Sequence, residues 1–399
     1  MKLPDGWKII KLNDVAVPLR RRNTIGNRNV LTSSAQFGLI NQMEYHNRSM
    51  AGENLSLYYL LYKGDFAYNR SSAKEYPFGA IRRLDKYDTG IVSSLYIPFT
   101  LKKDSCCSDF LAYLLDSDVI NQYLYQVCQE GARNHGLLNI AKEDFFQMPL
   151  CLPNCTNEQR RIAEFLGTWD KAIEKLERLI AAKEKQFKSL MQGLLTPQHH
   201  WTSHVLKDLG YAYGGLSDKK ADDFGHGYQY IPYLNIFTNY FVDIEDMGNV
   251  SIKDNEYQNE VKYGDIFFTI SSETPDEVGM CSVLLSNLKN TYLNSFSFGF
   301  RLNNFDILLP EFAAYYFRGN YFRRLLKTLA QGATRYNLSK NSFMLSRIVI
   351  PNNLHKQKEI AAILSSAQNE LGLLKKELAA LEKQKRGLMQ KLLTGTWRV

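Results

Sequence analysis

The sequence has no long run of apolar residues. Its uninterrupted apolar stretches are far shorter than the roughly 18 residues of a membrane span. The first residues, MKLPDGWKII, also lack the apolar centre of a secretory leader. We therefore expect a soluble, cytoplasmic protein with no membrane partner.

Metal-binding and disulfide patterns are also missing. The six cysteines are scattered and form no CxxC pair, which favours reduced thiols over disulfides or a zinc site. Cys151 and Cys155 have the spacing of two ligands without obvious partners, so ordinary thiols are expected there. His199, His200 and His204 follow Pro197, where a solvated linker is expected. We predict no metal and no cofactor.

Recognisable catalytic signatures are absent too. No GxxxxGK[ST] loop is present to hold ATP, and no glycine-rich strand-to-helix turn suits a dinucleotide or S-adenosylmethionine. No Asn-Pro-Pro-aromatic or Asp-Pro-Pro-aromatic run is present to hold the target base of an amino-methyltransferase. A free-standing enzyme is therefore the least favoured class, and a non-catalytic binding protein is expected.

What the chain does have is enough apolar sequence for two or more folded units. Its 399 residues are 45% hydrophobic and 23% charged, which is ordinary for a globular protein. The formal net charge of +8 is compatible with a polyanionic partner but does not establish one.

The dominant feature is an internal repeat. Residues 153–196 recur at 351–394 without a gap, and 18 of the 44 aligned positions are identical. A longer, aromatic-rich segment precedes each copy. The sequence therefore predicts four parts: a first module at 1–153, a helix at 154–197, a second module at 198–350 and a second helix at 351–399.

Both repeated segments have the heptad pattern of a coiled coil. Lys183 and Lys385 are the polar exceptions and are predicted to help fix the register. About 38 residues per helix give a length of roughly 57 Å. An antiparallel pair needs no long return linker, because one module lies between the two helices in the sequence. The alternative is two separate helices, each packed on its own module. The predicted seam consists of Ile162, Leu166, Trp169, Ile173, Leu176, Ile180, Leu190, Leu194, Ile360, Leu364, Leu371, Leu374, Leu378, Leu381, Leu388 and Leu392.

The modules repeat more faintly. Gly64-Asp65 and Gly264-Asp265 each open a predicted strand. Single helices are predicted at 110–129 and 312–331, each followed by a glycine turn with an arginine close behind. Short strands with one or two helices indicate an α+β module rather than a doubly wound sheet.

Polar and basic residues occur at equivalent loops of the two modules. Arginine beside Asn or Ser offers forked donors for guanine and amide contacts for adenine, and further cations suit phosphates. Solvated surface charge is the alternative for each residue alone. Arg82-Arg83 and Arg323-Arg324 are further phosphate candidates. The candidate DNA-binding residues are Arg20, Arg21, Arg22, Asn69, Arg70, Ser71, Ser72, Lys74, Arg133, Asn134 and His135 in the first module, and Thr269, Ser271, Ser272, Thr334, Arg335, Tyr336, Asn337 and Lys340 in the second.

The whole chain resembles the specificity subunit of a type I restriction–modification system. The resemblance rests on the duplicated helix, with Gln159 and Gln357 near its start and Leu-Leu-Thr at its end, and on the Gly-Asp strand openings. Phe78-Gly79-Ala80-Ile81, after Tyr68-Asn69-Arg70, also resembles one variety of that family's recognition domain.

The resemblance implies two target recognition domains, each reading one half of a bipartite site in double-stranded DNA. The helices would set the spacer and dock two modification (methyltransferase) subunits and the restriction (motor–nuclease) subunits. It implies a non-catalytic chain in a complex that methylates adenine and cuts DNA with ATP. Two alternatives stay open: a recognition subunit of another modification or defence system, and a coiled-coil assembly adaptor without DNA binding.

Overall fold

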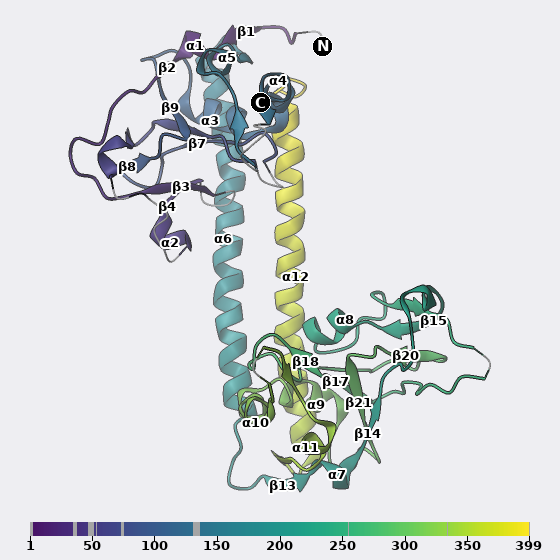
Figure 1. The fold of residues 1–399 in the computed structure, drawn as a ribbon. Coiled ribbons are helices and arrows are strands. Elements are labelled where there is room, and N and C mark those ends of the chain that lie inside the picture. Colours follow the sequence, from purple (N-terminus) through teal and green to yellow (C-terminus); the bar gives the residue numbers. More distant parts are fainter. Residues whose placement is uncertain are drawn as a thin grey trace. The chain divides into compact units, whose positions relative to one another are not determined.

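The computed structural model contains two compact units. It describes residues 3–34, 38–46, 52, 54–72, 76–130, 136–253, 255–332 and 334–398. Unit 1 comprises Met1–Glu177 with Glu377–Val399, and unit 2 comprises Arg178–Lys376. Each unit holds one module and a segment of both long helices, α6 (Thr156–Leu195) and α12 (Leu354–Leu392) (Figure 1).

The module of unit 1 is built around an antiparallel four-stranded sheet in the order β2-β9-β6-β7. Phe66, Ala67 and Tyr68 of β6 are all buried, because this strand has neighbours on both sides and both faces covered. The elements are β1 (Trp7–Lys11), α1 (Leu12–Val15), β2 (Ala16–Pro18), β3 (Leu31–Ser34), β4 (Gly38–Asn41), α2 (Gln42–His46), η1 (Leu55–Leu57), β5 (Tyr59–Tyr62), β6 (Phe66–Asn69), β7 (Ala80–Arg83), β8 (Thr89–Val92), β9 (Tyr96–Leu101), α3 (Ser108–Asp116), η2 (Asp118–Ile120), α4 (Asn121–Val127), β10 (Gln129–Glu130), β11 (Leu138–Asn139), α5 (Lys142–Phe146) and β12 (Pro149–Pro153).

The module of unit 2 has the equivalent antiparallel sheet in the order β14-β21-β17-β19. It adds a three-stranded sheet, β16-β15-β20. The elements are β13 (Thr202–Val205), α7 (Leu206–Leu209), β14 (Gly210–Gly214), η3 (Ala221–Asp223), β15 (Phe224–Ile231), α8 (Tyr233–Thr238), β16 (Gly248–Val250), β17 (Ile266–Thr269), β18 (Ser271–Ser272), β19 (Cys281–Val283), β20 (Thr291–Leu293), β21 (Ser297–Leu302), α9 (Pro310–Tyr316), α10 (Asn320–Leu329), β22 (Tyr336–Asn337), α11 (Lys340–Met344) and β23 (Arg347–Ile350).

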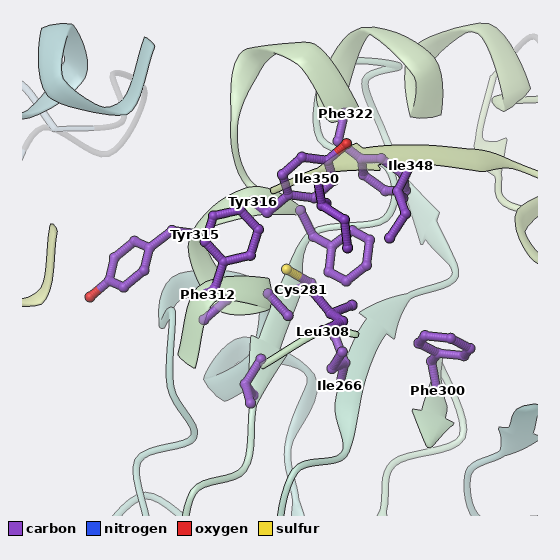
Figure 2. Close-up of a cluster of buried hydrophobic side chains, with 14 of the residues drawn as sticks. Ile266, Cys281, Phe300, Leu308, Phe312, Tyr315, Tyr316, Phe322, Ile348 and Ile350 are labelled. Atoms are coloured by element: carbon purple, nitrogen blue, oxygen red, sulfur yellow. The ribbon is translucent and has the colours of Figure 1, made fainter. Parts of the chain in front are cut away.

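One face of each four-stranded sheet packs on helices. In unit 2 the aromatic rings of α9, including Phe312 and Tyr316, lie beside Ile266 of β17 and Ile350 of β23 in a fully enclosed core (Figure 2). The corresponding core of unit 1 gathers Phe66 and Phe99 from the sheet with Phe110 from α3. The α+β class with two repeated modules and two long paired helices is confirmed.

The Gly-Asp pairs are the turns that start the two central strands. Gly64 and Gly264 have φ values of +92° and +84°, a region that side chains with a Cβ rarely adopt. The carboxylate of Asp65 then accepts the backbone N–H of Tyr62 at 2.7 Å, and Asp265 accepts that of Lys262 at 2.7 Å. The two residues together therefore fix where each strand begins.

The predicted single helices at 110–129 and 312–331 are wrong, because each is split in two. In unit 1 the Ser117 hydroxyl donates to the carbonyl of Leu114, which ends α3, and accepts the N–H of Val119 at the start of η2. In unit 2 Gly319 has extended backbone and precedes α10. These breaks let the second helical segment turn back over the core.

Within each unit, the segments of α6 and α12 pair antiparallel. In unit 1 Lys385 forms an ion pair with Asp170, and in unit 2 Lys183 pairs with Glu370 at 2.7 Å and Lys375 with Glu184 at 2.6 Å. In unit 1 the first half of α6 thus faces the last part of α12, and in unit 2 the last part of α6 faces the middle of α12. The seam lysines thus have carboxylate partners on the facing helix, as a register-setting role requires.

The predicted seam faces inward. All sixteen of its residues are buried or half-buried, whereas apolar side chains off the seam, such as Leu179 and Leu373, are exposed by 43% and 67%. The ends of the seam enter the module cores: Ile162 and Leu392 belong to that of unit 1, Ile360 belongs to that of unit 2, and Leu194 packs against the latter. The two alternatives from the sequence therefore combine, since each helix segment packs on a module and on the other helix.

Candidate nucleic-acid interface

In both modules the backbone brings together two loops that are far apart in the sequence. In unit 1 the N–H of Leu138 donates to the carbonyl of Arg70 at 2.8 Å, and that of Ser72 to Gly136 at 2.6 Å. In unit 2 the N–H of Leu338 donates to the carbonyl of Ile270 at 2.8 Å, and β18 pairs with β22. We call these the loop pairs: residues 69–72 with 136–139, and 269–272 with 334–338.

The loop pair of unit 1 holds Arg70 in place through its backbone and its side chain. Its Nε donates to the carbonyl of Leu95 at 2.7 Å, and the side chain stays half-exposed. The Asn69 side-chain oxygen accepts the N–H of Ser71 at 3.1 Å, which leaves the Ser71 side chain exposed. Lys74, Arg133, Asn134 and His135, also predicted from the sequence, lie outside the described residues.

The arginine run at 20–22 divides into different environments. Arg21 forms an ion pair with the buried carboxylate of Asp65 and lies over the ring of Tyr62. Arg22 donates to the carbonyl of Leu57 and lies 4.1 Å from the centre of the Tyr59 ring. Arg20 is exposed. Arg21 therefore neutralises the strand-opening aspartate, a partner that the sequence did not predict.

Unit 2 has an equivalent ion pair, in which the arginine comes from a different position in the sequence. Here Arg301 of β21 supplies the guanidinium to Asp265, with Nε and Nη2 at 2.7 and 2.6 Å from its oxygens, and the Tyr213 hydroxyl donates to the same carboxylate. Burial and this carboxylate together raise the pKa of Tyr213 well above its ordinary range. Both modules therefore need one arginine for the buried aspartate, taken from different places in the sequence.

Two residues predicted to contact a ligand in unit 2 are turned inward. Thr269 is fully buried because β17 is a central strand, so the expectation that it contacts DNA is wrong. Ser272 is 8% exposed, and its hydroxyl donates to Glu277 at 3.2 Å and accepts the N–H of Thr274. The Ser272 hydroxyl therefore stabilises the turn after β18.

The remaining predicted residues of unit 2 are accessible. Thr334, Arg335, Asn337 and Lys340 are exposed, Ser271 is half-exposed, and Tyr336 packs partly on the module core. The cation and the amide thus project from one hairpin, between α10 and α11. This arrangement offers donors and acceptors of the kind that reads base edges.

The additional phosphate candidates are mostly engaged inside the modules. Arg82 is 7% exposed and forms an ion pair with Asp116. Arg323 donates to the carbonyls of Gly279 and Asp276, at 2.9 and 2.6 Å. Arg82 therefore holds α3 on the sheet, and Arg323 holds α10 on the loop before β19, roles that their positions beside Arg83 and Arg324 in the sequence did not indicate.

Three residues at the loop pairs were not predicted. The Tyr233 hydroxyl, at the start of α8, donates to the carbonyl of Ser271 at 2.9 Å, and burial raises its pKa. Leu95 and Phe296 occupy equivalent turns and are 47% and 63% exposed. An alignment of the two modules that matches Tyr96 with Ser297 would have shown Leu95 and Phe296 as equivalent apolar residues in polar turns.

The expected linker is shorter than predicted, because one of its three histidines lies in a strand. His204 lies in β13, paired with β23, and its Nε2 is 2.8 Å from the Thr202 hydroxyl, so only His199 and His200 stand before the module. In the described part of the chain, no three His, Cys, Asp or Glu side chains gather as a metal ion would require. No described helix combines the length and apolar character needed to cross a membrane.

Comparison with known proteins finds similarity to type I restriction enzyme specificity subunits. Residues 199–383 match the family model of the type I restriction modification DNA specificity domain. The chain is 29% identical over 219 residues to the putative type I restriction enzyme MjaX specificity subunit of Methanocaldococcus jannaschii, a match that spans 53% of this chain and 49% of that protein. It is 24% identical over 332 residues to the MjaVIII specificity subunit of the same organism, spanning 78% of this chain and 75% of that one.

Solved structures share the fold over the whole chain. A structure describing complex assembly and conformational transition of the type I restriction–modification system has a TM-score of 0.61 at 18% identity, covering 98% of this chain and 99% of that one. The S subunit of the type I restriction–modification system from M. genitalium has a TM-score of 0.55 at 16% identity, covering 98% of each chain. The HsdS subunit from Thermoanaerobacter tengcongensis has a TM-score of 0.50 at 18% identity, covering 100% of this chain and 99% of that one. The specificity-domain model thus matches the second module, and both curated relatives are type I restriction enzyme specificity subunits.

Proposed function

We propose that this chain is the DNA-recognition subunit of a type I restriction–modification complex, and that each module reads one half of a bipartite duplex target. The observation that supports this most strongly is the repeated loop pair. In both modules the same backbone hydrogen bonds assemble the same two loops beside the end of the central strand. The side chains carried there differ, as two different half-sites would require.

The chemistry of the loop pairs supports contacts to base edges. Arg70 and Ser71 in unit 1, and Arg335 and Asn337 in unit 2, combine a forked cation with small polar groups. Such side chains recognise guanine O6/N7 and adenine N6/N7 in the major groove. Exposed Lys340 is placed to contact a phosphate, which positions a protein without carrying sequence information.

The long helices would set the spacer between half-sites and dock the other subunits. Each helix contributes to both units, so its length links the two modules. Phe165 and Ile363, at equivalent positions of the repeat and outside the seam, are exposed by 37% and 46%. They suit two equivalent docking sites for modification subunits, which would bring adenine methylation; restriction subunits would bring ATP-dependent cleavage.

Substitution of the two loop arginines tests the proposal. Arg335→Ala should cost roughly 1–3 kcal/mol of binding to the preferred duplex, with relaxed preference at one base pair of one half-site. Arg70→Ala should do the same in the other half-site. Arg347→Ala and Arg160→Ala, exposed arginines outside the loop pairs, serve as controls and should leave binding unchanged.

Three outcomes of these titrations would count against the proposal. A uniform loss on all sequences with a shallower salt dependence would make the loop arginines phosphate contacts rather than base readers. Failure of the folded wild-type chain to prefer any duplex would favour the assembly adaptor. Preference changes in the control variants alone would place the recognition surface elsewhere.

A further inference from the structure

In each module a large apolar side chain is exposed in the turn beside the loop pair. Leu95 and Phe296 lie in the turns that lead into β9 and β21, at 47% and 63% exposure. Asn69 pairs with Tyr96, and Thr269 with Ser297, so these turns lie at the sheet end where the loop pairs begin. The exposure thus recurs at equivalent places in two modules with different sequences.

Hydrogen bonds fix both turns to the loop pairs. In unit 2 the N–H of Ile270 donates to the carbonyl of Phe296 at 2.9 Å. The buried Asn294 side chain accepts the N–H of Phe296 at 2.9 Å and donates to the carbonyl of Ile231 at 3.1 Å. In unit 1 Arg70 Nε donates to the carbonyl of Leu95. The apolar side chains are therefore presented on fixed backbone, next to the residues proposed to read bases.

We propose that Phe296 and Leu95 each recognise a thymine, by packing on its C5-methyl group in the major groove. This inference rests on the proposed DNA-recognition function. The thymine methyl is the apolar feature of base edges in that groove, and phenylalanine is among the side chains that contact it. An apolar side chain fixed beside an arginine that reads polar edges matches that mixture of groups. Each half-site should therefore contain a thymine.

Removing single methyl groups from the DNA tests this directly. Selection from a random duplex library with the full-length chain first gives the preferred site. Each thymine of that site is then replaced singly by deoxyuridine, which lacks the methyl group. One replacement in each half-site should weaken wild-type binding by about threefold to fivefold, the effect of one methyl group withdrawn from water.

The variants assign each effect to a side chain. Phe296→Ala should bind the thymine and uracil duplexes equally at one position, and Leu95→Ala should do so in the other half-site. Phe296→Leu should keep most of the methyl preference. Tyr257→Ala and Ile9→Ala, at side chains exposed by 87% and 64% outside the loop pairs, should behave as wild type. The melting temperature of each variant shows that it is folded.

The outcomes separate the inference from the function it rests on. A wild-type chain without sequence preference contradicts the proposed function itself. Sequence-specific binding with a half-site that lacks thymine, or with the same methyl effect in Phe296→Ala as in wild type, overturns only the inference. Loss of binding to a methyltransferase subunit in Phe296→Ala, with methyl preference intact, would assign the side chain to a protein interface instead.

Discussion

Replacing Gln357 by leucine should detach the start of α12 from its module. The Gln357 side chain is fully buried and makes three hydrogen bonds to backbone. Its Oε1 accepts the N–H of Leu309 at 2.9 Å, and its Nε2 donates to the carbonyls of Ile307 and Pro351 at 2.7 and 2.9 Å. Leucine has similar volume and leaves these three backbone groups without a partner.

The expected loss follows from how buried each group is. An unpaired buried polar group costs about 1–3 kcal/mol. The bond to Pro351 is buried, whereas those to Leu309 and Ile307 are nearer the surface and can be partly replaced by water. We therefore expect a total of about 3–4 kcal/mol. Gln159, the equivalent residue in unit 1, bonds only Cys107 and Pro153, so Gln159→Leu should cost about 2 kcal/mol.

Native-state hydrogen exchange suits this test, because two units need not unfold together. The free energy of opening of β23 and the first turns of α12 should fall in Gln357→Leu, and that of β12 in Gln159→Leu. Gln390→Leu, an exposed position on α12, is the control and should change less than 0.5 kcal/mol, as is usual for surface sites. A loss below about 1 kcal/mol in Gln357→Leu, or a larger loss in Gln159→Leu, would show that these hydrogen bonds do not hold the helix starts on the modules.

Three other predictions follow from the same structure. The purified chain, incubated with S-adenosylmethionine, ATP, magnesium and mixed-sequence DNA, should leave the DNA unchanged; reproducible methylation or cleavage would contradict a non-catalytic role. Seven-residue insertions beside Lys183 and beside its partner Glu370 should keep the seam and lengthen the helix pair by about 10 Å. The preferred spacer between half-sites should then be about three base pairs longer. An unchanged spacer in a folded variant would show that the helices do not set the distance between half-sites. Iodoacetamide at pH 8 should label exposed Cys155 first, because burial raises the pKa of Cys106 to about 11 and that of Cys281, keeping both as thiols; labelling of Cys281 before Cys155 in the folded chain would show that its core opens.

The long helices were predictable because their pattern is local and repeated. The heptad spacing of the seam and the lysines within it are visible in the sequence, and the structure gives both lysines carboxylate partners. Only the facing position differs: Lys183 lies opposite Glu370, whereas the repeat aligns it with Leu381. The internal repeat matches residues of the two helices in the same order, whereas antiparallel pairing places residues opposite one another in reverse order.

The modules were less predictable because their determinants are distant in sequence. The sequence indicates a polar strand end at Thr269, but its strand lies in the middle of the sheet, so the side chain is buried. Arg21 belongs to a basic run in the sequence, but its guanidinium forms an ion pair with Asp65, 44 residues away. The loops at 69–72 and 136–139 are joined by backbone hydrogen bonds that no side-chain pattern reveals.

Exchange of one module tests whether each module reads its own half-site independently. Residues 1–153 are replaced by the corresponding module of a related specificity subunit, and both proteins are used to select duplexes from the same random library. We expect two conserved blocks of sequence separated by an unread spacer for each protein, with one block changed and the other block and the spacer retained. A single conserved block, or simultaneous change of both blocks in a folded chimera, would contradict independent reading of two half-sites by two modules.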